Sequence, residues 1–121
     1  MVNPDQTGPR HPGDSSTRIH PTRLTVAPDA FIASTAVLKG EVTIGERSSV
    51  WFNVVLRGDL APVVIGADSN IQDGAILHVE VDGPAVVGNR VSVGHMALVH
   101  GAEVEDDCIV AMGAMVLSGA R

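Results

Sequence analysis

The sequence predicts an all-β fold, a parallel β-helix of hexapeptide repeats with about five triangular coils. Two observations carry this prediction. The first is an aliphatic residue at every sixth position, interrupted by insertions of three and four residues and by one turn that is a residue short. These ladder residues are Val26, Ile32, Leu38, Ile44, Val50, Leu56, Ile65, Ile71, Leu77, Val87, Val93, Val99, Val104, Val110 and Val116. The second is a small residue four positions after most of them, such as Ala30, Ser48, Ser69 and Ala97.

Each repeat is expected to form one face of a coil and the corner that follows it. The aliphatic residue points inward, the small residue allows a tight turn, and three repeats of six residues complete a coil. Fifteen repeats therefore give five coils. An ordinary β-sandwich is the alternative, but its strands alternate with a period of two, which does not explain a ladder with a period of six.

Domain organisation follows from where the period begins. Residues 1–18 are rich in Pro, Gly and Ser and have no period, so they are predicted to form a flexible N-terminal tail. Residues 19–121 are predicted to form the β-helix domain. The chain stops in mid-repeat at Arg121, and we therefore expect this domain to be incomplete at its C-terminus.

Composition excludes several classes of function. A net charge of −6 gives no support to nucleic-acid binding, which needs a basic face. No apolar run is long enough to span a bilayer, so no membrane partner is expected. The single cysteine cannot form an internal disulfide and fits a reducing compartment, which makes the cytoplasm the expected location.

Polar side chains fall into two columns when the repeats are assigned to faces in threes. Arg57, His78 and His100 each directly follow a ladder residue of the same face, so they are expected to form a first column with the ~4.8 Å spacing of neighbouring strands. A second column lies on the preceding face, two positions after the ladder residue. It contains Phe52, Asp73, His95 and Met112, with Trp51 and Gln72 beside it.

The two columns predict a metal site that is shared between subunits. His78 and His100 can share a metal within one chain, whereas His95 projects from another face. A neighbour related by a three-fold axis could supply its His95, and the same packing would bring its Asp73 near Arg57. Three neutral imidazoles with an open fourth position are typical of catalytic zinc, which lowers the pKa of bound water to about 7.

Further polar residues are candidates for the surroundings of this metal. Gln72 could form a hydrogen bond with the metal-bound water. Asp59 could orient Arg57 or accept a hydrogen bond from an outer-shell group. Plainer roles are also open: Asp59 could cap a turn in a loop at residues 57–62, and Arg57 with Asp73 could be a structural ion pair first.

Three segments resemble the gamma-class carbonic anhydrase family: residues 49–59 (SVWFNVVLRGD), 70–74 (NIQDG) and 93–101 (VGHMALVHG). The hexapeptide repeat itself is similar to that of left-handed β-helix proteins, and the handedness comes from this resemblance. The family implies a homotrimer with zinc, or iron or cobalt, at each interface. His78 and His100 of one chain and His95 of the next would bind the metal, and Arg57, Asp59, Gln72 and Asp73 would line or brace the site.

The sequence departs from the family's well-studied active members in two respects, of which the end of the chain in mid-repeat is one and the loops near the site are the other. These members carry an acidic loop with a glutamate proton shuttle, whereas here Leu60 follows Asp59 and the short loop after His78 offers only Glu80 and Asp82. The resemblance still implies reversible hydration of CO₂ to bicarbonate by a metal-bound hydroxide. The alternatives are thioester hydrolysis in the same site, a non-catalytic trimeric scaffold, and acyl transfer without a metal.

Overall fold

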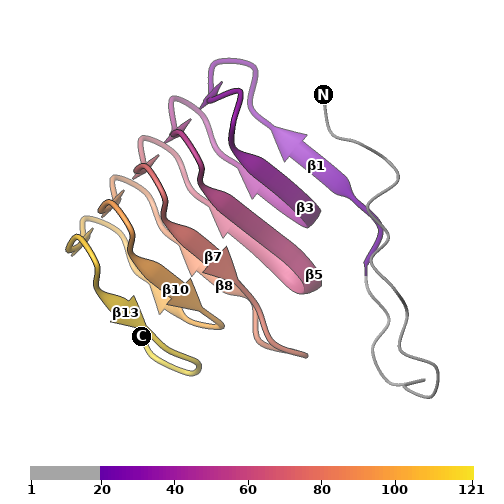
Figure 1. Cartoon of the computed structure of the whole chain (residues 1–121), viewed down its shortest axis with the longest axis vertical. Helices are drawn as coiled ribbons and strands as arrows, with labels where there is room; N and C mark the ends of the chain where they lie inside the picture. Colours follow the sequence, from indigo (N-terminus) through magenta and orange to yellow (C-terminus); the bar gives the residue numbers. More distant parts are fainter. Residues whose placement is uncertain (1–19) are drawn as a thin grey trace.

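The computed structural model describes residues 20–121, in which every regular element is a β-strand. The predicted tail at residues 1–18 lies outside the described residues. The architecture is the expected left-handed parallel β-helix of about five triangular coils, stacked along one axis as Figure 1 shows. The described part contains no helix, and hence none long and apolar enough to cross a membrane.

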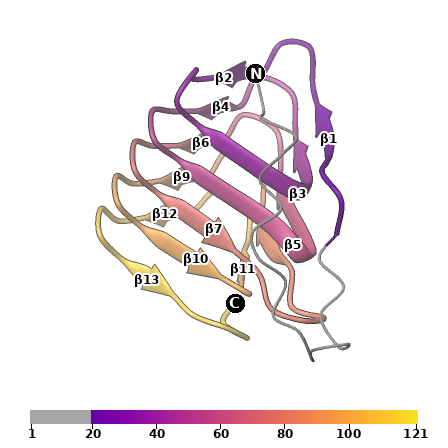
Figure 2. The ribbon, with the colours of Figure 1, turned by 45° about the vertical axis from the view of Figure 1, so that its right-hand side comes forward.

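Thirteen strands form the three faces of the prism, and two of them turn a corner. β3 and β5 each run from one face onto the next, which joins two faces into a single sheet, and the third face is a separate sheet. Figure 2 shows this third face beside the other two. The strands of the first two faces are β1 (Arg23–Val26), β3 (Val37–Ile44), β5 (Val55–Ile65), β7 (Ile76–His78), β8 (Ala85–Val87), β10 (Leu98–His100), β11 (Glu103–Val104) and β13 (Met115–Val116). Those of the third are β2 (Phe31–Ile32), β4 (Ser49–Val50), β6 (Asn70–Ile71), β9 (Ser92–Val93) and β12 (Ile109–Val110).

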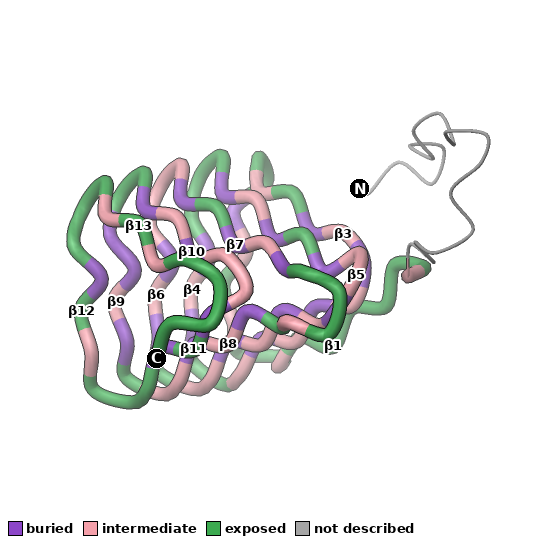
Figure 3. The backbone as a smooth tube through the Cα atoms, turned by 90° about the horizontal axis from the view of Figure 1, so that it is seen from below, coloured by how far each residue is buried: buried purple, intermediate pink, exposed green. Residues whose placement is uncertain are grey.

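The core is the predicted aliphatic ladder. Strand pairing aligns Leu56 with Leu77 and Leu77 with Val99, and all three side chains are fully buried. In Figure 3, where successive coils lie side by side across the picture, buried segments recur from one coil to the next. Burial of these aliphatic side chains is the main favourable contribution to folding, since the described core contains no aromatic residue.

The ends of the ladder are less buried than the sequence suggests. Val26 was expected to point into the core, but it is 38% exposed. The reason is that β1 pairs with β3 on one side and with no other described strand. A side chain in the first coil therefore has core neighbours from one direction only. At the other end Val116 is partly buried for the same reason.

Residues 57–62 correct one expectation, because they do not form a loop. They lie within β5, whose pairing with β3 continues through a register shift between Gly40 and Val42. Gly40 has a φ of +78°, and a Cβ atom there would collide with the carbonyl oxygen of Gly58. The two glycines thus let the paired strands pass the corner in close contact, which fixes Asp59 at the corner itself.

A second corner carries an alternating ladder of charges. Successive turns place Asp29, Arg47, Asp68, Arg90 and Asp107 at equivalent positions. Nε of Arg47 lies 2.7 Å from Asp68, and Nε of Arg90 lies 2.6 Å from Asp107. The hydrogen bonds from these guanidinium groups hold the pKa of both carboxyls below the usual value.

Candidate metal centre

Strand pairing brings the first column together. Arg57 of β5 is in register with His78 of β7, and His78 is in register with His100 of β10. In-register residues of parallel strands project from the same face, so the three side chains lie one above another on the outside of the prism. The ladder residues directly before them point inward and fix this orientation.

The two histidines contact each other through one ring nitrogen each. Nδ1 of His78 and Nε2 of His100 are 3.2 Å apart, and the ring planes meet at 69°. Zinc binds imidazole nitrogen at about 2.0–2.1 Å with tetrahedral angles, which requires a separation of about 3.3–3.4 Å between two such nitrogens. The observed separation is close to that expected for two ligands of one tetrahedral metal ion.

The second nitrogen of each ring, which does not face the other histidine, has a polar partner within hydrogen-bond distance. Nε2 of His78 lies 3.1 Å from Oδ1 of Asp59, and both side chains are largely buried. Nδ1 of His100 lies 3.0 Å from Oγ of Ser118, which donates to Oε1 of Glu80 at 2.6 Å. Metal-binding histidines have such partners on the second ring nitrogen, because they fix the ring orientation and the tautomer.

Ser118 is the functional candidate that the sequence reasoning missed. It follows the column position of Leu117 and lies 18 residues after His100, one coil away. That spacing is the available signal, since a residue one coil further on stands beside His100. Asp59 contacts two members of the first column: its carboxylate lies 3.1 Å from His78 and 3.6 Å from Arg57.

Arg57 adds a positive charge at the open side of the histidine pair. Its Nη2 lies 3.4 Å from Nδ1 of His78, and half of its side chain is exposed. Asp59 contacts the other terminal nitrogen and so orients the guanidinium group. A planar, exposed guanidinium in this position can bind an anion such as a carboxylate through two parallel hydrogen bonds.

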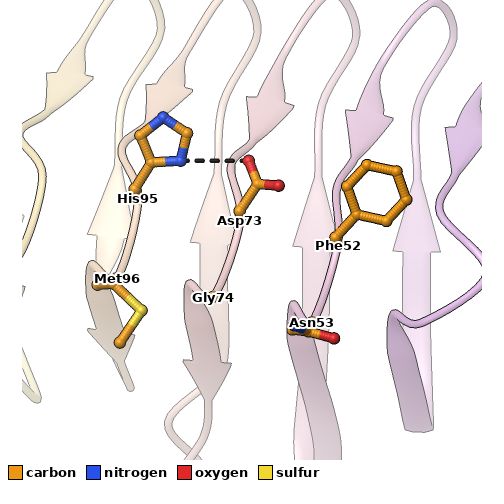
Figure 4. A pocket seen from close by; sticks show the side chains of 6 residues that line it. All are labelled: Phe52, Asn53, Asp73, Gly74, His95 and Met96. Atoms are coloured by element: carbon orange, nitrogen blue, oxygen red, sulfur yellow. Dashed lines mark ion pairs between the residues drawn. The ribbon is translucent and has the colours of Figure 1, made fainter.

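The second column lies on the third face of the prism. His95 follows β9, and Asp73 follows β6 one coil earlier. Nδ1 of His95 is 3.2 Å from Oδ2 of Asp73, and Figure 4 shows the two side chains turned toward one another. They line a shallow pocket with Phe52, Asn53, Gly74 and Met96. Asp73, which was expected to pair with Arg57 of a neighbour, thus contacts His95 within its own chain.

His95 and Gln72 do not join the histidine pair within one chain. Among residues 20–121, no three His, Cys, Asp or Glu side chains are close enough to hold a metal ion. The reason is geometric, because His95 projects from a different face. Gln72 also lies beside the second column, where its amide nitrogen donates to Asn70 at 3.0 Å.

Exposed aromatic side chains border the second column. Phe31 and Trp51 lie with ring centroids 5.0 Å apart, and Trp51 meets Phe52 at 6.1 Å. All three rings are substantially exposed, with Phe52 at 47%. Exposed aromatic clusters of this kind are enriched at protein interfaces.

The chain is similar to proteins named as carbonic anhydrases. It is 44% identical over 96 residues to "Carbonic anhydrase" of Geobacillus kaustophilus, covering 79% of this chain and 53% of that protein. It is also 44% identical over 97 residues to "Gamma carbonic anhydrase 2, mitochondrial" of Arabidopsis thaliana, covering 75% of this chain and 35% of that protein. The chain is thus similar, over most of its own length, to proteins named as gamma carbonic anhydrases. No protein-family model matches it.

These similarities cover only part of each relative, and one solved structure is also similar to the chain. The chain spans about half of the length of the Geobacillus relative and about a third of the Arabidopsis one. The crystal structure of a Bacillus cereus protein assigned as an acetyltransferase is 28% identical, with a TM-score of 0.54, and the match covers 82% of this chain and 73% of that one. A protein assigned as an acetyltransferase is therefore a structural neighbour of this chain.

Proposed function

We propose that this chain forms a homotrimer that catalyses reversible hydration of CO₂ to bicarbonate at metal sites between its subunits. One observation carries the proposal: the metal-facing nitrogens of His78 and His100 lie 3.2 Å apart. A cytoplasmic location is part of the proposal and is supported by the single cysteine.

The proposed ligands are His78 and His100 of one subunit and His95 of its neighbour. Two of the three side chains needed for a catalytic zinc site are thus already paired, and the third lies exposed on another face. Zinc, for which iron or cobalt could substitute, would lower the pKa of a bound water to about 7 and so provide a nucleophile at neutral pH. The exposed rings of Phe31, Trp51 and Phe52 support an interface close to His95.

The neighbouring residues have distinct proposed roles. Asp59 holds His78 in the orientation that directs its Nδ1 toward His100. Arg57 binds the negative charge that develops as CO₂ becomes bicarbonate, because its guanidinium lies beside the metal-facing nitrogen. Asp73 orients His95, and across the interface it would also meet Arg57. Gln72 would hydrogen-bond the attacking water from the neighbouring subunit.

Acyl transfer without a metal is the second candidate. The likeness to the Bacillus cereus acetyltransferase structure favours it, and a histidine would then act as general base. The pairing of two imidazoles nitrogen to nitrogen argues against it, since a general base does not require a second histidine at that distance. Thioester hydrolysis uses the same metal site as the leading proposal, and a non-catalytic scaffold would use the metal only to lock the trimer.

The deciding experiment combines metal content, particle mass and turnover. Protein purified without chelator should contain about one metal per chain in a trimer by light scattering, and it should hydrate CO₂. His95→Ala should stay trimeric and lose turnover, whereas His20→Ala, which changes an exposed histidine outside both columns, should match the parent protein. A metal-free monomer would overturn the proposal, and full acetyl transfer after chelation would favour the second candidate.

If the trimer binds metal but does not hydrate CO₂, acyl-CoA hydrolysis is the next assay. Activity there would replace the proposed substrate with a thioester in the same site. Loss of the trimer on chelation, with no turnover of either substrate, would instead identify a metal-locked scaffold.

A further inference from the structure

The first column continues one coil below Arg57, with a second cation. Lys39 of β3 is in register with Arg57 of β5, in the same pairing that aligns Leu38 with Leu56. The column therefore runs from Lys39 through Arg57 to His78 and His100 on the outside of the prism. Lys39 is also the only lysine in the sequence.

The two cations are neighbours, and only Arg57 has a carboxylate partner among the described residues of its own chain; across the proposed interface Asp73 of a neighbour would also meet Arg57. In-register residues on adjacent strands are separated by about 4.8 Å, at which distance like charges repel. Asp59 lies 3.6 Å from Arg57, and no ion pair among residues 20–121 includes Lys39. Glu41 is two positions along β3, but beyond the corner at Gly40, where it lies 3.6 Å from His20.

This arrangement is unusual for a chain with a net charge of −6. Positive charges on such a protein are expected to pair with its abundant carboxylates, as Arg47, Arg90 and Arg121 do. Lys39 has no such partner among residues 20–121, so it adds a local positive potential beside the proposed site, which attracts small anions. A neutral molecule gains nothing from this potential, whereas an oxyanion does.

We propose that Lys39 and Arg57 together form a binding site for a small oxyanion at the edge of the histidine pair, and that this oxyanion is bicarbonate. The choice of bicarbonate rests on the proposed function. Lys39 acts in this account by binding the charged product or substrate and not as a catalytic residue, because it stands two coils from His78. Arg57 lies between Lys39 and the histidines and would contact the same anion.

The single lysine allows a direct test by NMR. Reductive methylation with ¹³C-formaldehyde keeps the lysine charge and labels only Lys39 and the N-terminal amine. On the metal-loaded protein, the Lys39 signal, assigned by its absence in Lys39→Gln, should shift saturably when bicarbonate replaces chloride at constant ionic strength. The N-terminal signal should not. A Lys39 signal that fails to saturate, or that saturates with inorganic phosphate alone, would overturn the assignment.

Two variants measure the contribution of the charge. Lys39→Gln should weaken bicarbonate binding about three-fold, the effect of one partly exposed charge. Arg23→Gln removes a positive charge from the exposed strand β1, outside the column, and should leave the affinity unchanged. Equal weakening in both variants would show a general charge effect and overturn the proposed site.

This test separates the inference from the proposed function. A saturable bicarbonate shift in a protein that does not hydrate CO₂ would remove the carbonic anhydrase proposal and leave the oxyanion site standing. CO₂ hydration with no change in the Lys39 signal would overturn the oxyanion site and leave the carbonic anhydrase proposal standing.

Discussion

The carboxylate of Asp59 lies 3.1 Å from Nε2 of His78, on the ring nitrogen opposite the one that faces His100. This contact depends on the corner in β5. Because the strand stays extended past Gly58, the side chain of Asp59 lies close to His78 of the first column. A carboxylate on the second nitrogen keeps a histidine oriented and makes it a better metal ligand.

Asp59→Asn should therefore weaken metal binding about 10- to 100-fold, the usual effect of removing such a partner. The measurement is competition for zinc against a chelator of known affinity. Asp82→Asn changes an exposed acid in the loop after β7 and serves as the control. Unchanged zinc affinity in Asp59→Asn would contradict a supporting role for this carboxylate.

The charged corner predicts a dependence of stability on pH. The pKa values of Asp68 and Asp107 are lowered in the folded protein from 3.8, chiefly by hydrogen bonds from Arg47 and Arg90. Their contribution is fully present above pH 3.8 and is lost as the pH falls through the lowered values. Urea unfolding below pH 4 should show this loss, and Asp68→Asn with Asp107→Asn should flatten it. An identical pH profile in the double variant would contradict the prediction.

Substitutions at two glycines can distinguish the cost of backbone strain from the cost of a steric collision. Gly40 and Gly113 both have positive φ, of 78° and 69°, which costs other residues about 1–2 kcal/mol. A Cβ at Gly113 meets nothing within 4 Å, whereas one at Gly40 collides with Gly58. Gly113→Ala should lower the free energy of unfolding by about this backbone cost alone. Gly40→Ala should lose clearly more in the same denaturation assay, and equal losses would rule out the close packing of the corner.

Buried serines at one corner link successive coils. Oγ of Ser69 donates to the carbonyl of Gly88 at 2.8 Å and accepts from the N–H of Val91 at 3.0 Å. Ser69→Ala leaves both backbone groups without this partner, which should lower the free energy of unfolding by about 1–3 kcal/mol. Ser92→Ala is the matched control, because its hydroxyl bonds only to the side chain of Asn70 and is partly exposed. A loss as large in Ser92→Ala would contradict this account.

The hexapeptide period was sufficient to predict the fold and the alignment of the first column. Since each coil repeats the last, numbering from Val26 places Arg57, His78 and His100 on one face before any coordinates are known. The structure has this pairing. The assignment of these residues to a metal stays a prediction, because it depends on a second subunit.

What the period could not predict lies where coils depart from it. The glycine pair at Gly40 and Gly58 keeps residues 57–62 extended, and no count of repeats indicates that. The one-coil spacing places Ser118 near His100, but the contact between the two side chains also depends on rotamers, which spacing does not determine. The alternating charges from Asp29 to Asp107 could have been predicted from the sequence, since they recur with the same spacing as the aliphatic ladder.

The position of the histidine pair across a coil boundary has a consequence for how the molecule opens. Each coil touches only its neighbours, so a β-helix unfolds by fraying from its ends, one coil after another. His78 and His100 belong to successive coils, and an ion bound by both would cross-link these two coils. Amide hydrogen exchange would then slow most in β7 and β10 when zinc is added. The same two imidazole rings would then both bind the metal ion and stabilise the β-helix against unfolding.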